Sequence, residues 1–120
     1  MKIIELTGTT DALGALTVTG TEKWTGYVEK VVMDYIDGDT GADITLTENG
    51  IVSQTILVVT NAGVADLTWY PRAVSNLNTD ASALASVEGN KLLVNSALKM
   101  VVAQGGNAKQ IRLLVYIRDE

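Results

Sequence analysis

The amino-acid sequence predicts an all-β fold of about eight to nine short antiparallel strands in a single domain, arranged as a sandwich or a barrel. Three observations support this prediction. Several short segments alternate apolar and polar residues, which is the period-two pattern of half-buried strands. Clusters of glycine, asparagine and aspartate separate these segments at even spacing, as in sandwiches and barrels. The length of 120 residues fits one domain over residues 1–120.

The first two segments each present one apolar face. Residues 2–7 place Ile4 and Leu6 on one side, and residues 1–10 are also compatible with an extended N-terminal arm that adds as a strand to a neighbouring subunit. Residues 15–19 alternate Leu16 and Val18 with threonines, so we expect a half-buried strand with its threonines toward water.

Residues 23–36 fit two interpretations. A helix would align Tyr27, Val31 and Tyr35 on one stripe. Two strand segments fit better, because β-branched and aromatic residues dominate and Gly26 weakens a helix. Gly26 is then the expected site of a β-bulge.

The middle of the chain predicts a hairpin and an edge strand. Residues 42–47 read as a strand that leads to Asn49-Gly50, a pair typical of a type I′ turn. The strand expected over residues 51–60 is apolar on both faces at 56–59, as in a central strand or an interface. Pro71 cannot donate to a ladder, so the strand over 67–74 should lie at an edge or break there.

The last elements form a hairpin. Residues 75–86 read as a loop or one helical turn, and residues 91–94 as a short strand. Two strands over residues 97–119 then meet at Gly105-Gly106. Their expected core face consists of Leu98, Met100, Val102, Ile111, Leu113, Val115 and Ile117. The opposite face of the second strand also carries apolar residues, so it is either covered by the same chain or contacts another subunit.

Composition argues against several classes of function. The chain has no cysteine and no histidine, which removes disulfides, thiolate metal sites and the commonest general base near neutral pH. The net charge of −5 does not fit a nucleic-acid partner. No apolar run reaches the roughly 18 residues of a membrane helix. The start of the chain lacks the long apolar region of a signal peptide, so a protein that left the cell would have to leave by lysis or another route.

Candidate reactive sites are weak. Asp37, Asp39 and Asp43 resemble a calcium loop only loosely, and an aspartate-rich turn explains them better. The spacing Ser96-x-x-Lys99 falls within an expected strand, where the two side chains would point to opposite faces. We therefore expect no catalytic residue, no cofactor and no enzymatic activity.

An interaction surface is the stronger expectation, because aromatic residues and arginine are enriched in interfaces. The expected interface residues are Trp69, Tyr70, Arg72, Arg112, Leu114, Tyr116 and Arg118. The alternative is that Trp24 and Trp69 fill the core in place of the absent phenylalanine. The 47% apolar content exceeds what one small core requires, which favours a homo-oligomer, a dimer or a trimer.

Two stretches carry a family resemblance: TILVVTNAGVADLTWYPRAV at 55–74 and LKMVVAQGGNAKQIRLLVYIRD at 98–119. They resemble small β-rich proteins encoded among the head genes of tailed bacteriophages, and the resemblance covers roughly residues 43–119. It implies a jelly-roll-like β-sandwich that is made in the host cytoplasm and serves as a capsid decoration (cement) protein on the outer surface of the virion. Its implied partner is the major capsid protein. The alternative is a carbohydrate- or receptor-binding module of a phage fibre or head–tail connector.

Overall fold

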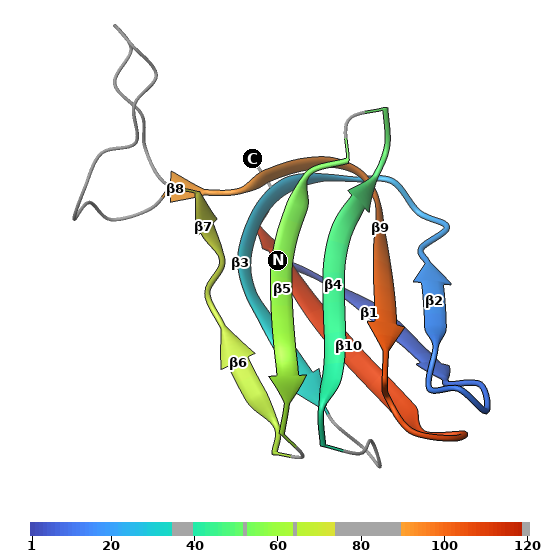
Figure 1. Ribbon diagram of the computed structural model, residues 1–120. Helices are drawn as coiled ribbons and strands as arrows, with labels where there is room; N and C mark the ends of the chain where they lie inside the picture. The colour runs from blue at the N-terminus through green and yellow to red at the C-terminus, as the bar shows by residue number, and fades with distance from the viewer. Residues whose placement is uncertain (35–39, 52, 64, 74–89, 119–120) are drawn as a thin grey trace, which may run out of the picture.

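The computed structural model describes residues 1–34, 40–51, 53–63, 65–73 and 90–118, and this part of the chain is all β (Figure 1). It contains ten strands and no helix. The strands are β1 (Lys2–Thr9), β2 (Leu16–Thr19), β3 (Trp24–Asp34), β4 (Ala42–Asn49), β5 (Thr55–Ala62), β6 (Leu67–Trp69), β7 (Arg72–Ala73), β8 (Asn90–Lys91), β9 (Leu93–Ala103) and β10 (Gln110–Arg118).

Eight of these strands form two antiparallel layers (Figure 1). Sheet A has the order β1-β10-β3-β6, and sheet B has the order β2-β9-β4-β5. The long strand β9 joins the layers, because residues 93–96 pair with β3 and residues 97–103 pair with β4. Strands β7 and β8 make a separate two-stranded ribbon. The predicted jelly-roll-like sandwich is therefore confirmed.

The core lies between the two sheets and contains the alternating residues that the sequence pattern identified. Leu113 in β10 stands opposite Leu6 in β1 and Met33 in β3, and all three are almost completely buried. Leu98, Met100 and Val102 of β9 are buried on the facing sheet. The buried apolar residues are Leu6, Val28, Val31, Met33, Ala42, Ile44, Leu46, Ile56, Ala62, Leu92, Val94, Leu98, Met100, Val102, Ile111, Leu113, Val115 and Ile117.

The segment that allowed two interpretations is one continuous strand, β3, rather than two segments. Its irregularity lies at Glu29, because Lys30 stands opposite Tyr116 while Val28 stands opposite Ile117. The expected bulge at Gly26 is therefore wrong. Gly26 has another role: a Cβ there would lie 2.4 Å from the carbonyl oxygen of Arg118, so glycine allows the backbones to approach closely.

Strand β5 differs most from expectation. Asn49 belongs to β4, neither Asn49 nor Gly50 has the positive φ of a type I′ turn, and residues 50–54 connect the strands. β5 pairs only with β4 among the described strands, so it is an edge strand and not a central one. Val58 on its outer face is 60% exposed.

The loop after β1 and the loop between β9 and β10 are joined by hydrogen bonds. The Thr10 hydroxyl donates to the carbonyl oxygen of Gly106 at 2.5 Å and accepts from the backbone N–H of Lys109 at 2.9 Å. The N–H of Gly105 donates to the Gly14 carbonyl at 2.9 Å. The hairpin loop over 104–109 is longer than the expected tight turn and contains positive φ at Gln104, Gly106 and Ala108.

Two further expectations concern chain ends and edges. Residues 2–9, which were compatible with a free arm, pair along their length with β10 as strand β1. Pro71 separates β6 from β7, so the strand does break at the proline, and β6 lies at the edge of sheet A. Residues 75–86 lie outside the described part of the chain.

Candidate functional site

The candidate site is the outer face of sheet A, which the side chains of β1, β10 and β3 form by pointing away from the core. Alternation places every second residue of these strands on this face. Its residues are Ile3, Glu5, Thr7, Lys30, Val32, Asp34, Arg112, Leu114, Tyr116 and Arg118. The side chains on this face are half-buried or exposed, whereas those on the opposite face of β10 are completely buried.

The apolar part of this face crosses all three strands. Leu114 stands between Glu5 on β1 and Val32 on β3. Tyr116 stands between Ile3, which is 56% exposed, and Lys30. The Lys30 Nζ lies 4.6 Å from the centroid of the Tyr116 ring, a cation–π contact that fixes the ring on the surface. Half-buried apolar side chains therefore form a continuous row that a partner can cover.

Ion pairs flank this row and neutralise its charges within the chain. The Arg112 guanidinium donates to the Asp34 carboxylate and lies 3.6 Å from a carboxylate oxygen of Glu5, so it links β3, β10 and β1. At the other end Glu29 pairs with Lys91 at 2.6 Å and with Arg118 at 3.3 Å. These pairs are partly exposed, so their contribution to stability is small, but they fix the positions of the charges.

Glu29 gives the surface a predicted dependence on pH. The hydrogen bond from Lys91 holds the pKa of Glu29 below its ordinary value. Partial burial raises this pKa, but the positive charges of Lys91, Arg118 and Arg72 also lower it. A lowered pKa in the folded state stabilises the protein above the unfolded pKa, about 4.3. This stabilisation is lost as the pH falls through the lowered pKa.

The substitution Glu29→Gln tests this dependence. We expect the variant to melt below the wild type at neutral pH, and the difference in melting temperature to shrink as the pH falls below about 4. Lys91→Gln should reproduce the same pattern, because it removes the hydrogen-bond partner. Thermal melts of the wild type and the two variants between about pH 3 and pH 7 measure how the difference in melting temperature depends on pH. A difference that stays constant with pH would contradict the assignment.

The other expected interface residues separate into different environments. Trp69 is half-buried and packs against the core, while Tyr70 is 64% exposed. The Arg72 guanidinium donates to the carbonyl oxygens of Pro71 at 2.7 Å and Glu29 at 3.2 Å, which ties it to the backbone of its own chain. Of these three, only Tyr70 is free to contact a partner with most of its side chain.

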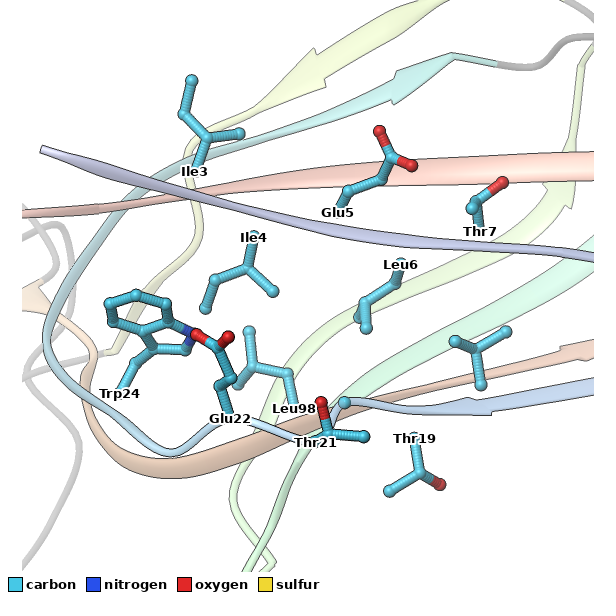
Figure 2. A pocket seen from close by; sticks show the side chains of 12 residues that line it. Ile3, Ile4, Glu5, Leu6, Thr7, Thr19, Thr21, Glu22, Trp24 and Leu98 are labelled. Carbon is cyan, nitrogen blue, oxygen red and sulfur yellow. The ribbon is translucent and has the colours of Figure 1, made fainter.

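A groove lies beside this face, where β1 and β2 diverge from the loop that joins them. It has a volume of about 380 Å³. Figure 2 shows Ile4 and Leu6 pointing into it, whereas Ile3, Glu5 and Thr7 point away. Trp24 stands at one end, and the Lys2 Nζ lies over its ring at 5.4 Å.

The expected metal candidates are not assembled into a site in the described residues. Asp37 and Asp39 lie outside them. The Asp43 carboxylate accepts the backbone N–H of Asn61 at 3.0 Å, which joins β4 to β5. The described ranges contain no cluster of three or more potential metal-binding side chains, and no helix in them could span a membrane.

The β10 residues of this surface were predictable, but those of β1 and β3 were missed. Alternation in β1 and β3 would have placed Ile3, Glu5 and Val32 on an outward face, yet nothing local shows that these strands flank β10.

Searches of protein-family models, curated proteins and solved structures find no match to this chain. The functional argument therefore depends on the residues themselves.

Proposed function

We propose that the protein is a capsid decoration protein of a bacteriophage, which binds the outer surface of the assembled head and stabilises it by non-covalent contacts. The major capsid protein is the proposed partner, and no bond is made or broken. The observation that carries the proposal is the outer face of sheet A. Its row of apolar side chains around Leu114 and Tyr116 lies between the ion-paired Arg112 and Arg118, and the Lys30 ammonium lies over the Tyr116 ring.

This surface suits a partner that adds apolar contact without demanding new ion pairs. Interfaces typically combine an apolar and aromatic centre with a polar rim. Here Leu114, Val32 and Tyr116 form the centre, and Arg112 and Arg118 lie at its ends. The resemblance of residues 55–74 and 98–119 to phage head proteins gives the class of partner. The jelly-roll order supports it only in part, because capsid and lectin domains share that fold.

The proposal is tested first on virions. Mass spectrometry of purified particles of the phage that encodes the chain should find the protein in an amount comparable with the major capsid protein. Heads stripped of the protein should rebind it from solution. Absence from purified virions would reject the proposal, and specific signals on a glycan array would favour the carbohydrate-binding alternative.

The surface is tested by single substitutions. Leu114→Asp and Tyr116→Asp should fold but lose at least about 30-fold in affinity for stripped heads, because each buries an unpaired charge at the centre of the contact. Thr45→Asp, on the outer face of sheet B, is the matched control and should bind as the wild type does. Unchanged binding by both β10 variants would show that this face is not the contact, and loss of binding in all three would argue against a specific surface.

A further inference from the structure

The sandwich has four sheet edges, and β5 differs from the others. An exposed edge strand presents unpaired backbone groups, and proteins usually protect it with charge, proline or short length. β1 carries Lys2 and Glu5, β2 has only four residues, and β6 has three and is followed by Pro71. β5 has eight residues, TILVVTNA, without an ionisable side chain or a proline. Among the described strands, it is the long edge without a charge or a proline. Its pairing with β4 shifts register on both sides of residues 57–59, so these residues form its regular part.

The side chains of β5 are also incompletely covered. Leu57 stands opposite the buried Leu46, and Val59 stands opposite the buried Ile44, so both face the core. Both are nevertheless only half-buried, because they lie at the margin of the sheet. Val58, on the other face, is 60% exposed. A further strand beside β5 would cover all three residues and pair the outer backbone groups.

We propose that this strand is β5 of a second copy of the chain. Two β5 strands related by a two-fold axis would pair antiparallel and join two B sheets of four strands into one of eight. Charge makes β5 the surface on which a second copy is least opposed. The whole chain carries a net charge of −5, so two copies repel each other over most surfaces, but β5 against β5 opposes no like charges. The inference does not depend on the proposed function.

Two lysine substitutions test the pairing. Sedimentation equilibrium should show that the wild type is a dimer, and Val58→Lys should weaken dimerisation at least about 10-fold, because lysine on an edge strand opposes pairing. Val101→Lys is the matched control: Val101 is 37% exposed on the same face but lies in β9, between β2 and β4. The Val101→Lys variant should remain a dimer.

The absence of cysteine from the chain permits a second, positional test. Single cysteines are placed in turn at Leu57, Val58, Val59 and Thr60, and oxidised dimers are measured on a non-reducing gel. Opposed residues in an antiparallel pair have Cα atoms about 4.5–5.5 Å apart, which suits a disulfide. Cross-linking should therefore peak at the two-fold axis and fall along the strand in both directions.

The proposal is overturned by any of three results. These are a monomeric wild type, equal dissociation of the Val58→Lys and Val101→Lys variants, or cross-linking that shows no peak along β5. Circular dichroism of the two lysine variants should match that of the wild type, because both side chains are exposed and need not unfold the chain. The results for capsid binding and for dimerisation are separate, so either proposal can fail alone.

Discussion

Replacing Gly26 with alanine should destabilise the folded protein by about 3 kcal/mol, at the upper end of the usual effect of overpacking. The added Cβ would lie 2.4 Å from the carbonyl oxygen of Arg118 and 2.7 Å from Cγ2 of Ile117. A side chain could turn aside, but the Arg118 oxygen belongs to the backbone of β10. Strands β3 and β10 would have to separate where β3 also pairs with β9. Urea unfolding measures the loss.

Gly63→Ala is the control for this variant. A Cβ at Gly63 meets no atom within 4 Å, and its φ is not positive. Alanine there should leave the free energy of unfolding unchanged or raise it by up to about 1 kcal/mol, because it restricts the unfolded chain. If Gly26→Ala were as stable as Gly63→Ala, the close approach of β3 and β10 would be wrong.

Leu113→Ala and Leu114→Ala should differ sharply although the residues are neighbours. Leu113 is completely buried between Leu6 and Met33, so its truncation leaves a cavity and should cost about 3 kcal/mol. Leu114 is half-buried on the outer face of sheet A, and its truncation should cost less than about 1 kcal/mol. The pair therefore separates the two faces of β10 within one strand.

The readouts of these variants also differ. Leu113→Ala should lower the melting temperature by about 10 °C, and it should bind stripped heads normally below that temperature. Leu114→Ala should melt close to the wild type and weaken head binding. Equal losses of stability would show that Leu114 is covered as fully as Leu113, which would place the outer face of sheet A inside the folded unit.

The fold class and the core were predictable because the signal for both is local. Alternation within one strand assigns Leu98, Met100 and Val102 to one face without knowledge of any neighbour. The edge position of β5 was not predictable in this way. Its apolar residues at 56–59 suggested a central strand or an interface. Local pattern could not choose between the two, because the number of neighbouring strands depends on the topology of the whole chain.

The same limit applies to the candidate surface. Arg112, Leu114, Tyr116 and Arg118 share a face by alternation, and this part of the prediction needs only β10 itself. The contributions of β1 and β3 depend on register between segments far apart in the sequence. The bulge was misplaced for a related reason: Gly26 was selected for its flexibility, whereas its role is to allow close contact with the backbone of Arg118.

The order of strands in sheet A also constrains how the protein is made. Strand β10 lies between β1 and β3, so among the described strands β1 has no paired neighbour until residues 110–118 are in place. Contacts so distant in sequence make folding slow. Until β10 pairs, Leu6 and Met33 lack Leu113, the buried residue that stands opposite both of them. A chain that has not yet placed β10 therefore exposes apolar surface that favours aggregation.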